Sequence, residues 1–369
     1  MTLKKLYIHR DVADTPAARK IRSRLSRVSC EIVDDGQVVF REVSGDGDAS
    51  AAVTKGKEVL FLTRNRGAFV KSCPGTREYT CCGYKILHIG TFCTMDCSYC
   101  ILQAYFHPPV LQFFLNQEQM LQELDELFVS PGIHRVGTGE FTDSMIWEFW
   151  TDTARLLVSK FAAQSRAVLE LKTKTTAIDD LKQLDHNKKT IVAWSLNTRH
   201  VIRTDERGTA SLDARFEAAA KCESWGYPLA FHFDPMVIYD GCEQDYEEVI
   251  RELFSRVRPE SVVWISIGTF RFMPDLKPIV QDRFPESKIV YGEFITGLDG
   301  KMRYFKPLRI ALYQRVIRCI REIAPDVTVY FCMEDDEVWK KSFGFLPSEK
   351  GGLEKMLDHS AVTHCRLSS

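Results

Sequence analysis

The sequence has no run of about 18 apolar residues, the length a helix needs to cross a membrane, so we expect no transmembrane helix. Its N-terminus, MTLKKLYIHRDVADT, has no apolar signal core, which predicts a protein that stays in the cytoplasm. Short repeats and low-complexity stretches are also absent. A net charge of −1 neither demands nor excludes a nucleic-acid partner.

Cysteine, in contrast, is abundant: 12 in 369 residues point to metal binding or catalysis before disulfides in a reducing compartment. Cys93, Cys97 and Cys100 have the spacing C-x3-C-x2-C in GTFCTMDCSYCILQ. Three such thiolates can hold three irons of a [4Fe–4S] cluster and leave the fourth open. This resembles radical SAM enzymes, in which S-adenosylmethionine (SAM) chelates the open iron. The alternative is a zinc site, for which His88 or His107 could supply a fourth ligand.

A second cysteine group lies upstream in CPGTREYTCC, with Cys73, Cys81 and Cys82. A second cluster is one interpretation, with Cys30 or Cys332 as its fourth ligand. Neighbours in a strand point in opposite directions, so the adjacent pair is awkward for binding one cluster. Buried structural thiols are the other interpretation, because free cysteine is often simply buried.

The pattern of apolar residues divides the chain into an N-terminal α/β unit (1–82), a central barrel (83–290) and a C-terminal hairpin and helix extension (291–369). In the first unit, residues 30–40 are expected to form two strands joined by a turn, and residues 44–57 a polar connector. In the central part, six strands alternate with helices, and one of these helices is expected in the run AIDDLKQL. This alternation predicts a partial (β/α)6 TIM-type barrel, whose chemistry lies at the carboxyl ends of its strands.

The second barrel strand is followed by the loop GTGEFTDS. Gly139 allows a ligand to approach the backbone closely, and Glu140 can accept hydrogen bonds from the ammonium group of SAM. Thr142, Asp143 and Ser144 are candidates for contacts to the sulfonium end or the ribose. A simple surface turn is an equally good interpretation of this loop taken alone.

Later strand ends add further candidates for SAM binding. Lys174 could pair with the SAM carboxylate, and Lys172, on the same face of the strand, is its rival. Ser195 and Asn197 alternate to one face of the fourth strand and could bond ribose hydroxyls. Asp234, at the end of the fifth strand, could contact the adenosine.

The C-terminal part contains a basic stretch interleaved with aromatic residues after the turn signal DG, formed by Lys301, Arg303, Tyr304, Lys306 and Arg309. Such a stretch can enter a nucleic-acid groove and stack on bases. The alternative is a solvated hairpin that leads into an amphipathic helix.

Over residues 70–345 the sequence resembles the spore photoproduct lyase family of radical SAM enzymes. The matching pieces are CSYCILQ, the TK of the third strand, GYPLAFHFDPMVIYDGCEQDYEEVI, the K-x-R-Y hairpin and VYFCMEDDEVW. The resemblance implies one cluster on Cys93, Cys97 and Cys100, and a 5′-deoxyadenosyl radical that reverts a thymine dimer in DNA. It also implies that Arg303 and Tyr304 engage the lesion.

Two departures from the family concern the return of a hydrogen atom to the product radical. The family has a donor cysteine just after the second barrel strand, where this chain has Glu140 and Phe141. The family also has a tyrosine directly after the last cluster cysteine, where this chain has Ile101, although Tyr99 inside the motif is kept. The half of the site that makes the radical matches, and the half that quenches it does not.

Other donors are therefore needed, and Cys242, Cys332 and Tyr99 are the candidates. Otherwise the chain is a radical SAM enzyme with a different small-molecule, peptide or nucleic-acid substrate. A non-catalytic alternative is a nucleic-acid binding protein with a structural or redox-sensing cluster. A flavodoxin or ferredoxin is the expected electron donor, and a monomer the expected state.

Overall fold

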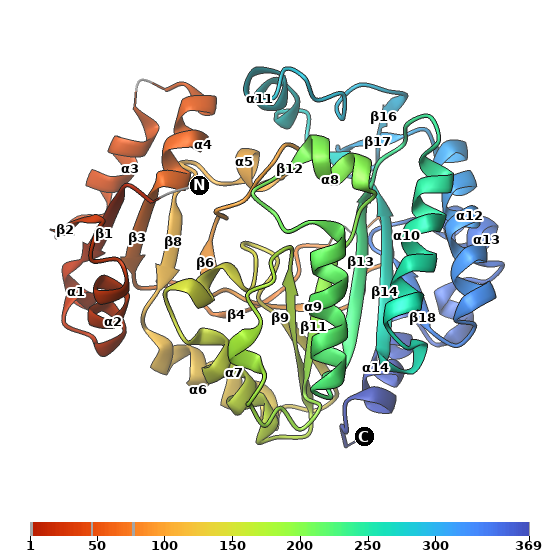
Figure 1. Cartoon of the computed structure of the whole chain (residues 1–369), viewed down its shortest axis with the longest axis horizontal. Coiled ribbons are helices and arrows are strands. Elements are labelled where there is room, and N and C mark those ends of the chain that lie inside the picture. Colours follow the sequence, from red (N-terminus) through yellow and green to blue (C-terminus); the bar gives the residue numbers. More distant parts are fainter. Residues whose placement is uncertain (1–2, 46, 76–77, 369) are drawn as a thin grey trace.

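A computed structural model describes residues 3–45, 47–75 and 78–368 of the chain. Two large sheets organise the molecule, and Figure 1 shows the N-terminal sheet at the left and the larger, curled sheet in the centre. Helices α12 and α13 cover the C-terminal side at the right (Figure 1). Among the described residues, no helix has the length and apolar character that a bilayer crossing requires.

The N-terminal sheet has the strand order β2-β1-β3-β8-β6, and only β6 runs antiparallel to its neighbour. Its strands are β1 (Lys5–His9), β2 (Ser29–Val33), β3 (Val59–Thr63), β6 (Gly90–Thr91) and β8 (Leu111–Phe114). Its helices are α1 (Arg10–Ala13), α2 (Pro16–Arg24), α3 (Gln37–Ser44) and α4 (Ala49–Glu58). Two of the strands follow residue 82, so the division of the chain at that residue stays a prediction.

The expected secondary structure of this unit is wrong in two places. The second half of residues 30–40 belongs to α3 and is not a strand, because Val39 and Val43 lie one helical turn apart and bury the same face. The expected connector contains α4, whose N-terminus is capped by the Asp48 side chain, which accepts hydrogen bonds from the backbone N–H of Ser50 and Ala51.

The larger sheet has the order β18-β14-β13-β11-β10-β9-β5-β4, with seven parallel strands and β4 antiparallel at one edge. The strands are β4 (Val70–Ser72), β5 (Lys85–Leu87), β9 (His134–Gly137), β10 (Ala167–Thr173), β11 (Thr190–Ser195), β13 (Leu229–Met236), β14 (Val262–Thr269) and β18 (Thr328–Phe331). The partial barrel is thus confirmed, and β18 adds a parallel strand beyond the six expected. Every residue of β14 is buried, as in a parallel sheet covered on both faces.

The connections between these strands carry the outer helices α6 (Gln117–Val129), α7 (Thr153–Ala162), α9 (Leu212–Ser224), α10 (Cys242–Arg256) and α12 (Lys306–Ile323). Helices α13 (Asp336–Phe343) and α14 (Leu353–His364) follow the last strand, β18. The helix expected in AIDDLKQL is only a short 3-10 turn, Asp179–Leu181. The hydroxyls of Thr173 and Thr175 accept hydrogen bonds from backbone N–H groups two residues on, and these bonds turn the chain directly after β10. Further 3-10 turns are Ile146–Phe149, Pro259–Ser261 and Pro347–Lys350.

Small elements complete the carboxyl end of the barrel. A three-stranded antiparallel sheet, ordered β15-β17-β16, forms the expected hairpin. The remaining elements are β7 (Asp96–Cys97), α5 (Leu102–Tyr105), α8 (Arg199–Asp205), β12 (Glu206–Arg207), β15 (Arg271–Phe272), α11 (Leu276–Arg283), β16 (Phe294–Thr296) and β17 (Met302–Tyr304). Because parallel strands end at one edge of the barrel, the candidate residues of several strands gather there.

Candidate functional site

The cysteine loop, residues 92–101, connects β6 of the N-terminal sheet to α5. Within it, β7 pairs antiparallel with β12, so that Cys97 lies opposite Glu206. The loop begins at Phe92, whose φ of 70° lies in the left-handed region that bulky residues rarely adopt. Surrounding contacts must therefore hold this backbone in place.

Gln103 fixes the carbonyl groups of the cysteine loop. Its side-chain amide nitrogen lies 3.2 Å from the carbonyl oxygen of Cys97, 3.0 Å from that of Ser98 and 3.3 Å from that of Cys100. Gln103 is 1% exposed, and its amide oxygen accepts a hydrogen bond from Arg283. One buried side chain thus donates to carbonyls along the whole second half of the loop and holds them together.

The three thiols have the chemistry that an iron–sulfur cluster requires. Cys93 and Cys97 are buried and Cys100 is half-buried. Burial raises the pKa of Cys93 to about 12, so this thiol keeps its proton until a metal displaces it. Among the described residues, no three His, Cys, Asp or Glu side chains converge on one metal ion. Thiols that each bind a different iron of a cluster need not converge on one point, so this donor set fits a cluster.

Neither histidine considered for a zinc site joins these thiols. The Nδ1 of His88 lies 3.0 Å from Nζ of Lys71, and its ring packs edge-on against Phe114 and Phe141. The Nε2 of His107 contacts the carbonyl oxygen of Ala104 at 3.0 Å. The geometry therefore favours the cluster over a closed zinc site.

A buried polar group lies directly behind the loop. The hydroxyl of Tyr99 donates a hydrogen bond to the Glu206 carboxylate, which also forms an ion pair with the fully buried Arg215. Burial alone would raise the pKa of Glu206, but Arg215 and Lys174 hold it below its usual value, so the carboxylate stays charged. The Nζ of Lys174 lies 5.7 Å from the centroid of the Tyr99 ring.

The loop after β9 is held to β10 by hydrogen bonds. Oδ1 of Asp143 accepts from the backbone N–H of Met145 at 2.9 Å and from the Thr173 hydroxyl at 2.8 Å, and Oδ2 accepts from the Lys174 N–H at 2.8 Å. The hydroxyl of Ser144 accepts from the Lys172 N–H at 3.0 Å. Asp143 and Ser144, predicted as ligand contacts, therefore serve first to shape the loop.

The remaining residues of that loop differ in their exposure to solvent. Glu140 is exposed, and its carboxylate lies 3.8 Å from Nζ of Lys172. Thr142 is buried, and its hydroxyl lies 3.4 Å from the carbonyl oxygen of Asp143. A Cβ on Gly139 would lie 2.9 Å from the Cβ of Lys172, so this close approach of two strands requires glycine.

The fourth-strand candidates differ in how their side chains are used. The side-chain amide of Asn197 donates to the carbonyl oxygen of Pro235 at 2.8 Å and accepts from the Tyr246 hydroxyl at 2.8 Å and from the N–H of Thr198 at 3.0 Å. These bonds occupy the amide within the protein. Ser195 is buried, and its carbonyl oxygen accepts a hydrogen bond from Arg215 at 2.8 Å.

Asp234, at the end of β13, is paired with Arg271, at the start of β15. The two guanidinium nitrogens of Arg271 lie 3.0 and 3.1 Å from the two carboxylate oxygens. Cys332, which follows β18, lies close enough to Arg271, Asp234 and Glu140 for their charges to affect the pKa of its thiol. Burial raises the pKa of Cys332 to about 11, so it is a thiol at neutral pH.

Cys242 has a different setting, at the first position of α10. It is 1% exposed, and its Sγ lies 3.7 Å from the Glu243 carboxylate. In the upstream cysteine group, Cys81 is exposed, and the Cys82 thiol donates a hydrogen bond that lowers the pKa of Cys81 to about 6. A second cluster on this group stays a prediction.

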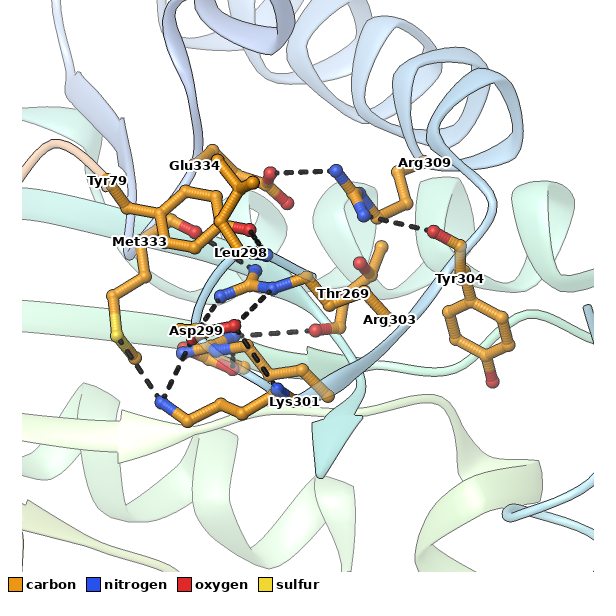
Figure 2. Close-up of polar contacts among 12 residues, drawn as sticks. Tyr79, Thr269, Leu298, Asp299, Lys301, Arg303, Tyr304, Arg309, Met333 and Glu334 are labelled. Atoms are coloured by element: carbon orange, nitrogen blue, oxygen red, sulfur yellow. Dashed lines mark hydrogen bonds and ion pairs between the residues drawn. The ribbon is translucent and has the colours of Figure 1, made fainter. Parts of the chain in front are cut away.

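The basic residues of the hairpin differ in burial: Arg303 and Arg309 are buried, and Lys301 and Lys306 are half-buried. Figure 2 shows the contacts of Lys301, Arg303 and Arg309. Nη2 of Arg303 lies 2.8 Å from the Asp299 carboxylate, its Nη1 donates to the carbonyl oxygen of Met333 at 3.1 Å, and its guanidinium covers the Tyr79 ring at 4.1 Å. Nζ of Lys301 is 3.4 Å from the same carboxylate. Arg303 is only 2% exposed.

Arg309 and Tyr304 are buried as well. Arg309 donates to the carbonyl oxygen of Tyr304 at 3.0 Å and to the Glu334 carboxylate at 3.2 Å. The Tyr304 ring stacks on Phe294 with centroids 4.3 Å apart and points away from the Arg303–Asp299 pair (Figure 2). Internal carboxylates and carbonyls thus occupy the side chains of Arg303 and Arg309, and a contact of this hairpin with a DNA lesion stays a prediction.

Sequence reasoning missed several residues of the site. Glu206 and Arg215 lie behind the cysteine loop, more than 100 residues later in the chain, and no motif marks them. Lys57, in α4, contacts the same loop. The exposed side chains of the hairpin include two apolar ones, Ile295 (44% exposed) and Leu298 (73%), and Phe305 (45%) follows directly after the hairpin.

Comparisons with known proteins agree on one family. The family model described as spore photoproduct lyase matches residues 2–304 of the chain. The spore photoproduct lyase of Bacillus subtilis (strain 168) is 25% identical over 297 residues, which cover 78% of this chain and 84% of the relative. That of Geobacillus sp. (strain Y412MC61) is 27% identical over 328 residues, with 85% and 90% covered.

Solved structures agree in fold. A double mutant of spore photoproduct lyase, with bound AdoMet and dinucleoside spore photoproduct, superposes with a TM-score of 0.79 at 23% identity. The match covers 89% of this chain and 99% of that one. A spore photoproduct lyase complexed with dinucleoside spore photoproduct gives a TM-score of 0.78 at 22% identity.

Proposed function

Because the chain belongs to the spore photoproduct lyase family of radical SAM enzymes, we propose that it cleaves SAM reductively and reverts a thymine dimer in DNA. The observation that carries the proposal is the cysteine loop at the carboxyl edge of the barrel, in which the Tyr99 ring lies beside Lys174. Cys93, Cys97 and Cys100 would hold a [4Fe–4S] cluster, which would supply the electron for SAM cleavage.

The proposed SAM site uses the free groups at the strand ends. A related lyase was solved with bound AdoMet, which supports SAM as the ligand here. Glu140 would accept hydrogen bonds from the SAM ammonium group, and Lys174 would pair with its carboxylate. Gly139, Thr142 and Ser195 would line the site. Asp143, Ser144, Asn197 and Asp234 would act indirectly, by holding the backbone and neighbouring side chains in position.

Cys332 is the best-supported hydrogen donor of the three candidates. It lies at a strand end among charged groups of the barrel mouth, whereas Cys242 lies in the first turn of an outer helix. The Tyr99 hydroxyl is engaged with Glu206. In the proposed step, the S–H bond of Cys332 breaks and a C–H bond forms on the product radical, which leaves the unpaired electron on sulfur.

Replacing Cys332 with alanine should uncouple SAM cleavage from product formation. We expect 5′-deoxyadenosine release to continue while formation of repaired product falls at least tenfold, because the product radical has lost its donor. Chromatography of both products after single-turnover reactions measures the ratio. The matched variant Cys242→Ala should keep the wild-type ratio, and the same loss in both variants, or in neither, would rule out Cys332 as the donor.

The proposed reaction can be tested directly with a dinucleoside substrate. Anaerobic incubation with SAM, a reductant and dinucleoside spore photoproduct should release thymidine and, with it, the cleavage products of SAM. A flavodoxin or ferredoxin is the expected natural reductant. Release of 5′-deoxyadenosine without thymidine would identify a radical SAM enzyme with another substrate, and absence of both would overturn the enzyme proposal.

DNA binding is proposed to use the exposed apolar tip of the hairpin, because apolar wedges enter damaged base steps more readily than paired ones. We expect Leu298→Ser to reduce the preference for a lesion-bearing duplex by roughly tenfold, the effect of about 1.4 kcal/mol of lost contact energy. Fluorescence anisotropy at two salt concentrations measures this preference. Val129→Ser, which changes a side chain that is 82% exposed at the end of α6, is the control. No binding to either duplex at low salt would exclude DNA as the partner.

A further inference from the structure

Lys57 is a buried lysine that the proposed chemistry does not yet use. It lies in the last turn of α4 and is 1% exposed. Its Nζ donates to the carbonyl oxygen of Cys93 at 3.0 Å and to that of Met95, and lies 3.6 Å from Oδ1 of Asp96. A buried ammonium group is costly unless such partners surround it, so this arrangement is a built contact rather than a chance one.

The backbone around Lys57 fixes its approach to the loop. A Cβ at the preceding residue, Gly56, would lie 1.6 Å from the carbonyl oxygen of Pro109, so only glycine allows α4 to pack this closely. The Lys57 ammonium also lies 4.5 Å from the centroid of the Phe92 ring. Phe92 is the residue with the left-handed backbone, directly before Cys93. Lys57 therefore contacts the strained entry of the cysteine loop as well as its carbonyl groups.

A second cation, Arg283, contacts the same loop. Nη2 of Arg283, at the end of α11, lies 2.9 Å from Oδ1 of Asp96, the same oxygen that Lys57 approaches. Arg283 also donates to Gln103, which binds the carbonyl groups of the loop. Asp96, which lies between Cys93 and Cys97 in the sequence, thus joins a cation from the N-terminal unit to a cation from the barrel.

We propose that Lys57 is a positioning residue that preforms the cysteine loop and places a fixed positive charge beside any cluster bound there. The proposal rests on the proposed cluster and assigns to the N-terminal unit a part in the radical chemistry. A cluster with three thiolates gains negative charge on reduction, so a buried cation next to it favours the reduced form. Removing that charge should make the cluster harder to reduce.

The first test uses the metal-free chain and does not depend on a cluster. In Lys57→Met, the carbonyls of Cys93 and Met95 lose their partner. We expect hydrogen exchange, followed by mass spectrometry, to become at least tenfold faster in the peptide covering residues 92–103. Peptides from β1 and β3 should keep their wild-type rates. Unchanged exchange in the loop would overturn the positioning role.

The second test uses the reconstituted protein. At the wild-type midpoint potential, the ratio of reduced to oxidised cluster should fall about tenfold in Lys57→Met, a shift of about 59 mV for a one-electron couple. Electron paramagnetic resonance during a redox titration measures it. Lys57→Arg should restore the ratio, and Lys55→Met, on the exposed side of the same helix, should leave it unchanged.

The outcomes separate this inference from the proposed function. If the wild-type chain binds no iron, the cluster proposal is overturned, and the hydrogen-exchange result alone tests the positioning role of Lys57. A wild-type chain with about four irons and the same midpoint potential as Lys57→Met would overturn the charge role alone. If circular dichroism shows that Lys57→Met does not fold, Lys57→Gln carries both measurements. Its amide has no charge, so the shift in midpoint potential should be the same, and its side chain is one bond shorter, so exchange in residues 92–103 should again become faster.

Discussion

Replacing Cys97 with alanine is expected to abolish both the visible charge-transfer absorbance of the reconstituted protein and its cleavage of SAM. Two remaining thiols cannot hold three irons of a cluster, so iron should fall from about four per chain to a small residue. The thiol is buried, and its strand pairs with β12, so no neighbouring cysteine can replace it without moving the loop. Absorbance spectra, iron and sulfide analysis and 5′-deoxyadenosine release measure the three effects.

The control is Cys30→Ala, which removes a half-buried thiol from β2 of the N-terminal sheet. It should keep the spectrum, the iron content and the turnover of the wild type. About eight irons in the wild-type chain would indicate that the upstream cysteine group binds a second cluster. A Cys97→Ala protein with the full spectrum would contradict the assignment of the ligands.

Replacing Glu206 with alanine is expected to lower the free energy of unfolding of the metal-free chain by about 3–5 kcal/mol. Arg215 is fully buried, and in the described structure Glu206 is the only carboxylate among its hydrogen-bond partners. The substitution would remove that carboxylate. The Tyr99 hydroxyl would lose its acceptor in the same substitution. Urea denaturation followed by circular dichroism measures the change.

A surface ion pair provides the comparison. Glu252 pairs with Arg199 at 2.9 Å at the protein surface, and Glu252→Ala should cost about 1 kcal/mol or less, because water screens exposed pairs. Equal losses in the two variants would show that the Glu206–Arg215 pair is not the buried support described above. A large loss for Glu206→Ala alone would establish that support.

The barrel could be predicted from the sequence because its signals are local. Buried strands such as β14 read as continuous apolar runs, and the helices between them show helical spacing. The run QVVFREV was misassigned because a short apolar run fits a strand as well as a helix until its buried face is known. The strand β18 is only four residues long and lies within the C-terminal extension, after α12, so the alternation did not reveal it.

The site was predictable to the extent that its residues are close in sequence. The spacing of the cysteines is itself the motif, whereas Lys57, Glu206 and Arg283 meet the loop only through the fold. The hairpin shows that the composition of a segment does not predict which of its charged side chains are buried. Arg303 belongs to a basic stretch, but its charge is used by Asp299, four residues earlier, and no pattern of charges reveals that a pair is buried.

The cysteine loop begins in β6 and, after α5, the chain returns to β8, and both strands belong to the N-terminal sheet. A loop whose two ends are hydrogen-bonded to one sheet cannot open without strain on that sheet. Binding and folding are therefore thermodynamically linked: whatever occupies the three thiols in the folded state also stabilises β6, β8 and the strands beside them. By the same linkage, any substitution that loosens the N-terminal sheet weakens the affinity of the thiols for iron, however far it lies from them.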